Sequence, residues 1–190
     1  MKRLFLAIPI NQQYTEMCMR FIEHLTLDKV RWINPENWHI TLVFLGSFPV
    51  DKVQALTDNL EEFFTQAPLF NLYFDHYSYK PEFKNPTMIW ANFQHSEAFD
   101  KLVIETYNQL TNFYSFQSIP FKISIRFHNI PHITLARLKQ EYNPFPELIK
   151  RKEEVPSLQV KDCHLFESVL LPKGAKYHLL HSFSLMHFTK

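Results

Sequence analysis

The sequence contains the tetrapeptide His-Ile-Thr-Leu twice, as HITLVFLG at residues 39–46 and as HITLARL at residues 132–138. The two copies begin 93 positions apart (132 − 39), which is about half of the 190-residue chain. Each copy starts with alternating polar and apolar residues, the pattern of a half-buried β-strand. A repeat at half the chain length suggests two related halves, each contributing one such strand.

The remaining hydrophobic periodicity predicts helices and strands in both halves of the chain. The expected segments are a strand at 3–10, a helix at 12–27, a strand from 38 that Gly46 and Pro49 end, a helix at 51–64 capped by Asp51, strands near 69–79 and 87–93, a helix at 96–112 capped by Ser96, and strands at 132–138, 158–171 and 177–188. We therefore predict an α+β fold of two related lobes, each with a sheet and helices.

Composition limits the kinds of ligand that the protein can bind. The formal net charge is +1, which argues against a broad basic face that grips a long duplex but leaves room for a small site for one phosphate or one RNA end. Only two glycines are present, and neither a GxGxxG nor a GxxxxGK[ST] phosphate loop occurs. Any phosphate must therefore be held by side chains.

The sequence also predicts a cytoplasmic protein without a membrane span. Its apolar runs are shorter than the roughly 20 residues that a spanning helix needs. The N-terminal stretch MKRLFLAIPINQQ resembles a signal peptide, but Pro9 interrupts it and no cleavage site follows, so a β-strand explains it better. Cys18 and Cys163 form no CxxC pair and are expected to be buried thiols of a reducing compartment.

The duplicated motif has the groups that phosphodiester cleavage by water requires. On a strand, residues i and i+2 share a face, so His39 lies beside Thr41 and His132 beside Thr134. Two imidazoles can act as general base and general acid near neutral pH, because the unperturbed pKa of histidine is about 6.5. The threonine hydroxyls can donate to the phosphate oxygens. This chemistry requires no metal and no cofactor.

Other histidine chemistries lack their motifs. A single His-x-Thr is more often structural than catalytic, and the duplication is what favours catalysis here. No HExxH, HxH, HxHxH or GxSxG occurs, and the pair His178 and His181 has no neighbouring carboxylate. The remaining histidines, among them His24, His76 and His95, are interpreted as surface or core residues.

Four stretches together resemble one known family. They are RLFLAI at 3–8, RWINPENWHITLVFLG at 31–46, PHITLARL at 131–138 and LFESVLLPKGAKYHLL at 165–180. In order and spacing they resemble the two-histidine (2H) phosphoesterases, and within them the RNA 2′,3′-cyclic phosphodiesterases, also called 2′-5′ RNA ligases. The resemblance covers nearly the whole chain. It implies a single bilobal domain over residues 1–190, with antiparallel sheets in two pseudo-symmetric lobes and the active-site cleft between them.

The resemblance also implies an activity and roles for individual residues. The expected reaction is hydrolysis of an RNA 2′,3′-cyclic phosphate end to a 2′-phosphate, with His39 as the general acid and His132 as the general base. Thr41 and Thr134 would hold the phosphate. Arg137 matches a phosphate-contacting position of the family, but strict alternation places it on the face opposite His132. It reaches the site only if the strand ends or bulges first.

Several alternatives remain open from the sequence. The same site could join RNA ends through a 2′-5′ bond, act on a small cyclic nucleotide, or bind a nucleotide or RNA end without turnover. The protein is expected to be a monomer whose partners are RNA ends or nucleotides with a 2′,3′-cyclic phosphate. Arg126 and His128 could reach an RNA end, although solvated loop positions explain them better. The nucleobase site cannot be identified among so many aromatic residues.

Overall fold

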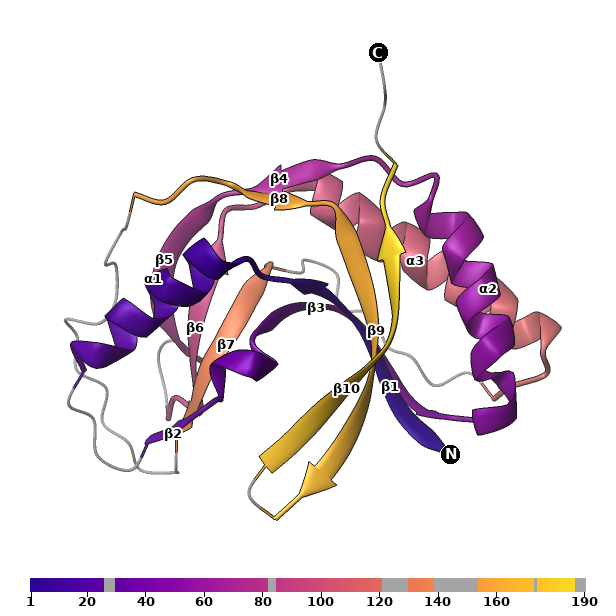
Figure 1. Ribbon diagram of the computed structural model, residues 1–190, viewed down its shortest axis with the longest axis horizontal. Helices are drawn as coiled ribbons and strands as arrows, with labels where there is room; N and C mark the ends of the chain where they lie inside the picture. Colours follow the sequence, from indigo (N-terminus) through magenta and orange to yellow (C-terminus); the bar gives the residue numbers. More distant parts are fainter. Residues whose placement is uncertain (26–29, 82–84, 121–129, 139–153, 173, 187–190) are drawn as a thin grey trace.

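The structure is a computed structural model that describes residues 1–25, 30–81, 85–120, 130–138, 154–172 and 174–186. Its centre is an antiparallel sheet in the order β10-β9-β1-β3-β7-β6-β5, with β2 paired to β7 (Figure 1). A second sheet pairs β4 with β8. The strands are β1 (Lys2–Pro9), β2 (Val30–Trp32), β3 (His39–Phe48), β4 (Phe70–Leu72), β5 (Phe74–Lys80), β6 (Met88–Phe93), β7 (His132–Leu138), β8 (Leu158–Val160), β9 (Asp162–Leu171) and β10 (Gly174–Ser184).

The large sheet consists of two halves that meet at the repeated strands. One half is β10-β9-β1-β3, and the other is β7-β6-β5 with β2 beside β7. Between β3 and β7 the register records one residue pair, Ile40 opposite Ile133. The predicted α+β class with antiparallel sheets is therefore confirmed, and each half contributes one His-Ile-Thr-Leu strand.

Helix α1 (Gln12–Glu23) covers the half that contains β5 and β6. The side chain of Asn11 accepts a hydrogen bond from the Tyr14 N–H and so caps the helix N-terminus. Phe21 stacks on Tyr77 with 3.5 Å between ring centroids, and Tyr14 stacks on Phe93. The buried face of α1 thereby covers the side of this half that faces away from His132.

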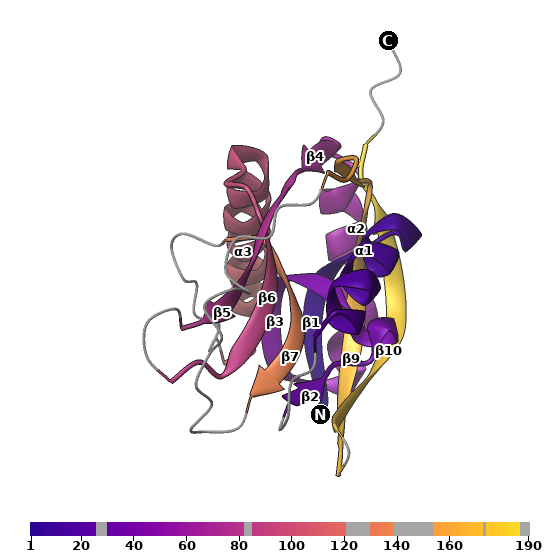
Figure 2. The same cartoon turned by 90° about the vertical axis from the view of Figure 1, so that its left-hand side faces the viewer.

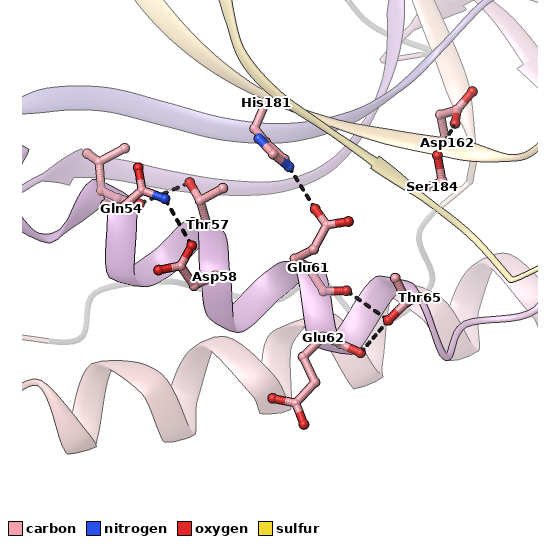
Figure 3. Close-up of polar contacts among 10 residues, drawn as sticks. Gln54, Thr57, Asp58, Glu61, Glu62, Thr65, Asp162, His181 and Ser184 are labelled. Carbon is pink, nitrogen blue, oxygen red and sulfur yellow. Dashed lines mark hydrogen bonds and ion pairs between the residues drawn. The ribbon is translucent and has the colours of Figure 1, made fainter.

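Helices α2 (Val53–Phe64) and α3 (Glu97–Phe116) pack against the other half (Figures 1 and 2). Phe64 of α2 stacks on Phe183 of β10, and Phe113 of α3 lies against Phe48 of β3. A polar contact adds to this packing, since Glu61 on α2 lies 2.7 Å from the ring of His181 on β10 (Figure 3).

The ends of two predicted elements differ in the structure. Ser96 caps α3 as expected, but Asp51 does not cap α2, because Val50–Lys52 forms a 3-10 turn and the helix begins only at Val53. Strand β3 runs through Gly46 to Phe48, since a glycine tolerates the positive φ of 72° found there. Cys18 and Cys163 are both buried, and no disulfide joins them. None of the helices in the described residues has the length and apolarity to cross a membrane.

Candidate active site

The two His-Ile-Thr-Leu strands have the same pattern of burial. Along His39–Leu45 and His132–Leu138, buried and exposed residues occur in the same order. In both strands the histidine and the threonine are partly buried, and the residue between them is buried. Ile40 is 1% exposed and Ile133 is 0% exposed. The apolar residues of both strands therefore pack into the core, which directs the histidines and threonines of both strands to the opposite side of the sheet.

The pairing of Ile40 with Ile133 fixes how the four polar residues are arranged. Continuing the antiparallel register by one residue places His39 opposite Thr134 and Thr41 opposite His132. The two histidines are then diagonal neighbours. The Cα atoms of such neighbours in an antiparallel pair lie about 7–8 Å apart. The two imidazoles therefore leave the same face of the sheet at neighbouring positions. A positive charge on His132 lowers the pKa of His39.

Both histidine rings are held by the same backbone contact. The Nδ1 atom of His39 lies 2.7 Å from the carbonyl oxygen of Asn37, and Nδ1 of His132 lies 2.8 Å from that of Ile130. A carbonyl oxygen only accepts, so each Nδ1 is the protonated donor. Each Nε2 is then the atom left for chemistry. In His39 this atom lies 3.1 Å from the Thr41 hydroxyl, which can donate to it.

Aromatic rings surround His39. Its ring centroid is 5.0 Å from that of Phe5 and 5.3 Å from that of Tyr177, which meets it edge-on at 79°. Phe166 lies behind them at 6.5 Å. Burial among these rings disfavours the imidazolium and lowers the pKa of His39 to about 4, against a smaller raising effect of the Asn37 carbonyl.

One tryptophan covers His132. The ring of Trp90 on β6 stacks on the imidazole with 3.5 Å between centroids and an angle of 14°. The Lys80 ammonium lies over the same tryptophan, 5.6 Å from its ring centre. Burial lowers the pKa of His132, the Ile130 carbonyl raises it, and the charge of Lys80 lowers it further. Both site histidines are therefore neutral near pH 7 in the protein without ligand.

A β-bulge brings Arg137 to the histidine face. Against β6, Ala136 pairs with Ile89 and Thr134 pairs with Trp90, so Leu135 is an extra residue in β7. The alternation shifts by one after Leu135, and Arg137 is exposed on the side of His132 and Thr134. From the sequence, Arg137 could reach the site only if the strand ended or bulged before it. The strand does bulge, at Leu135.

Strand β3 has a bulge at the corresponding place. Against β1, Val43 pairs with Leu6 and Thr41 pairs with Ala7, which leaves Leu42 as the extra residue. Phe44 consequently occupies the position that Arg137 has in the other strand, and it is 65% exposed. The two strands thus share their bulge but differ in the side chain that it redirects, so only β7 places a cation there.

A pocket of about 800 Å³ lies near His39, although neither site histidine lines it. One wall is β2 and the following 3-10 turn η1 (Pro35–Asn37), and the other is the tip of the β9–β10 hairpin. Arg137 also lines it. The pocket reaches His39 through two of its lining residues, because Asn37 provides the carbonyl that holds the ring and Tyr177 contacts the ring edge.

The structure brings together the five residues singled out from the sequence, His39, Thr41, His132, Thr134 and Arg137. Sequence reasoning did not identify the rings around the histidines, since Trp90 and Tyr177 are two aromatic residues among 30. No local pattern marked them, because Trp90 reaches the site from β6, next to β7, and Tyr177 reaches it from β10, three places from β3 in the sheet. Arg126 and His128 lie outside the described residues.

The other histidines have partners of their own. His76 contacts Asp75, and His95 contacts Asp100. Across the described part of the chain, no group of three or more His, Cys, Asp or Glu side chains is arranged to hold a metal ion.

Comparison with known proteins adds an independent observation. Residues 5–90 match the family described as LigT like Phosphoesterase. A protein of Archaeoglobus fulgidus named RNA 2′,3′-cyclic phosphodiesterase is 26% identical over 184 residues, which are 95% of this chain and 99% of the relative. The chain resembles the LigT-like phosphoesterases of the 2H superfamily. The resemblance predicted from the sequence is thus confirmed.

Further similar proteins align over comparable lengths. A Thermotoga maritima protein, also named RNA 2′,3′-cyclic phosphodiesterase, is 26% identical over 94% of this chain and 93% of its own. The crystal structure of E. coli LigT complexed with 3′-AMP superposes with a TM-score of 0.75 at 23% identity, covering 98% of this chain and 99% of LigT. At that identity the likeness concerns the fold.

Proposed function

We propose that this protein hydrolyses 2′,3′-cyclic phosphate ends of RNA to 2′-phosphate ends. The observation that carries the proposal is the matched pair of imidazoles on one face of the sheet, each fixed through Nδ1 to a backbone carbonyl with Nε2 left for the substrate. The name shared by the A. fulgidus and T. maritima relatives supports the choice of substrate.

In the proposed reaction, Nε2 of His132 takes a proton from water as the water oxygen attacks phosphorus. The P–O3′ bond breaks, and His39 gives a proton to the leaving 3′-oxygen. The products are a 3′-hydroxyl and a 2′-phosphate. Thr41 and Thr134 donate to the non-bridging oxygens, and Arg137 adds a positive charge beside them.

The acid in this scheme needs a proton that the protein without ligand lacks at neutral pH. Burial holds the pKa of His39 at about 4, so its ring is neutral before substrate binds. An anionic phosphate within a few ångströms favours the imidazolium and raises the pKa. The substrate itself thus helps to generate the acid. The pH profile of kcat/KM should accordingly show one group that must be protonated and one that must not.

The first experiment uses a short RNA with a 2′,3′-cyclic phosphate, incubated with the protein in EDTA, followed by identification of the product end. A 2′-phosphate supports the proposal and its leaving group. A 3′-phosphate keeps the two histidines but reverses the leaving group. An untouched substrate contradicts the proposal and favours a binding module or a small cyclic nucleotide as substrate.

The second experiment tests the roles of the histidines. His39→Ala and His132→Ala should each lower kcat by about 10²–10⁴-fold, the usual contribution of acid–base groups. His24→Ala, which removes an exposed histidine at the end of α1, is the matched control and should retain activity. Full activity in either site variant would contradict the acid–base pair.

Further features belong to the same proposal. We propose that residues 1–190 act as a single monomeric domain in the cytoplasm and need no cofactor. The reverse reaction, joining RNA ends through a 2′-5′ bond, uses the same groups by microscopic reversibility, but the large excess of water favours hydrolysis.

A further inference from the structure

The carbonyl that holds the His39 ring belongs to a turn with little packing of its own. Nδ1 of His39 lies 2.7 Å from the backbone oxygen of Asn37, the last residue of the 3-10 turn η1. None of the three residues of η1, all of which the structure describes, is buried. The peptide that carries this oxygen also carries the Trp38 N–H, which donates to the Pro35 carbonyl at 3.0 Å. The direction of the oxygen therefore follows the turn as a whole, and a shift of the turn moves the His39 ring.

The side chain of Asn37 fastens this turn to a distant strand. Its Nδ2 amide donates to the backbone oxygen of Ala175 on β10 at 3.1 Å, across 138 positions of the chain. Within the described residues, this is the one hydrogen bond that joins η1 to an element far away in the sequence. Asn37 thus contributes twice, because its backbone oxygen holds the ring and its side chain anchors the turn that carries that oxygen.

The strand at the other end of this bond also lacks a neighbour. The register of β9 with β1 ends at Glu167, so residues 168–171 pair with β10 alone. In both views the tip of the β9–β10 hairpin extends beyond the other strands (Figures 1 and 2). A two-stranded ribbon is marginally stable by itself. Contacts at the site therefore help to place the tip, through the Ala175 oxygen and through Tyr177, whose ring meets that of His39 edge-on at 5.3 Å.

The chain before His132 is anchored in a different way. Nδ1 of His132 lies 2.8 Å from the oxygen of Ile130, whose side chain has no polar group to donate. The following carbonyl, that of Pro131, accepts a hydrogen bond from the Phe93 N–H of β6 at 2.9 Å. A neighbouring strand thus fixes the backbone before His132, whereas a side chain performs this task before His39.

The orientation of the ring decides whether His39 can act as the acid. The contact with the Asn37 oxygen keeps the neutral ring protonated on Nδ1, so Nε2 is directed to the Thr41 hydroxyl and the substrate. Once the ring is an imidazolium, the same contact becomes a stronger, charge-assisted hydrogen bond. A displaced turn weakens both effects, and a misplacement of about 1 Å can cost about 10²-fold in rate.

We propose that Asn37 is a positioning residue, which couples the place of the β9–β10 hairpin to the orientation of His39. The bond from its amide to Ala175 keeps the η1 turn, and with it the Asn37 oxygen, where the ring needs it. The effect on turnover rests on the proposed function. The effect on the His39 ring does not, because it concerns the protein without substrate.

The first test removes the amide and keeps every backbone group, in Asn37→Ala. Asn108→Ala makes the same substitution at an exposed position of α3 and is the matched control. On a short RNA with a 2′,3′-cyclic phosphate, Asn37→Ala should lower kcat by about 10- to 100-fold, with a smaller change in KM, because the acid is displaced and the phosphate-binding side chains stay. Asn108→Ala should retain the wild-type values. An unchanged kcat in Asn37→Ala would overturn the inference.

The second test observes the ring directly. Heteronuclear NMR at pH 7.5 distinguishes the protonated imidazole nitrogen from the other one, and His39→Gln identifies the signals of this residue. The wild type should show His39 protonated on Nδ1. Asn37→Ala should show a mixture of both tautomers, since the Thr41 hydroxyl can also accept from Nε2. A ring that stays wholly protonated on Nδ1 in Asn37→Ala would refute the inference even if kcat falls, because Asn37 would then act on another group.

The third test disturbs the same bond from the hairpin. Gly174 has a φ of 137°, which an alanine adopts only with strain, so Gly174→Ala shifts the backbone next to Ala175. This change should lower kcat in the wild type and have a much smaller effect in Asn37→Ala, where the bond is already lost. Equal effects in both backgrounds would contradict the coupling. If the wild type does not cleave the RNA, the proposed function fails, and the NMR comparison alone decides the inference.

Discussion

The low pKa of His39 predicts that replacing this histidine changes how stability depends on pH. A histidine whose pKa is about 4 in the folded protein and about 6.5 in the unfolded chain binds more protons when unfolded. Well above pH 6.5, His39 therefore leaves the free energy of unfolding unchanged. As the pH falls from 6.5 toward 4, it lowers that free energy. His39→Gln keeps a polar side chain at the site and removes this penalty.

The two pKa values give the size of the effect. Between pH 7.5 and pH 5.0, the proton taken up by His39 in the unfolded chain costs the native state about 2 kcal/mol. Below pH 4 the cost approaches about 3 kcal/mol, which corresponds to the full difference of about 2.5 pKa units. Either amount is a large part of the free energy of unfolding of an ordinary domain, about 5–15 kcal/mol.

The assay is urea unfolding at pH 7.5 and at pH 5.0, followed by the same measurement on His39→Gln and on His24→Gln. The loss of stability between the two pH values should be smaller in His39→Gln than in the wild type. We compare each variant's loss with that of the wild type. The loss in His39→Gln should be smaller by about 2 kcal/mol than the loss in His24→Gln. Equal losses in His39→Gln and His24→Gln would refute the argument that the aromatic rings keep His39 neutral.

Three further results are expected. Ile133→Ala should lower the free energy of unfolding by about 2–5 kcal/mol in urea, because this fully buried residue lies at the one recorded pair between β3 and β7. Trp90→Leu should raise the pKa of His132 toward its ordinary value in an NMR titration, since the stacked ring contributes to its burial; an unchanged pKa would argue that Trp90 plays no part. Turnover should persist in EDTA, because the two imidazoles provide both acid and base; a loss reversed by added metal would contradict this.

The sequence was sufficient to predict the centre of the site. His39, Thr41, His132 and Thr134 occur in identical tetrapeptides, and a period of two residues places them on the polar face of any half-buried strand. The face of the sheet on which Arg137 lies depends on the bulge at Leu135. That bulge arises from how β6 pairs with β7, and nothing in HITLARL indicates it.

The surroundings of the site could not be predicted for a related reason. Trp90 and Tyr177 reach the histidines through strand order, since β6 pairs with β7, β9 pairs with β1 and β10 pairs with β9. Similarly, Arg31 comes beside Arg137 because the three-residue strand β2 pairs with β7. Such neighbours are far apart in the chain, and local periodicity has no information about long-range pairing.

The single pair Ile40–Ile133 has a consequence for how this fold can diverge. Adjacent strands in a sheet lie about 4.7–4.9 Å apart, a distance set by backbone hydrogen bonds and independent of side-chain identity. Loops can therefore lengthen and core residues can be exchanged while the two imidazoles keep their separation, provided that this one register is kept. Relatives that retain only about a quarter of the residues can accordingly preserve the same spacing of reactive groups.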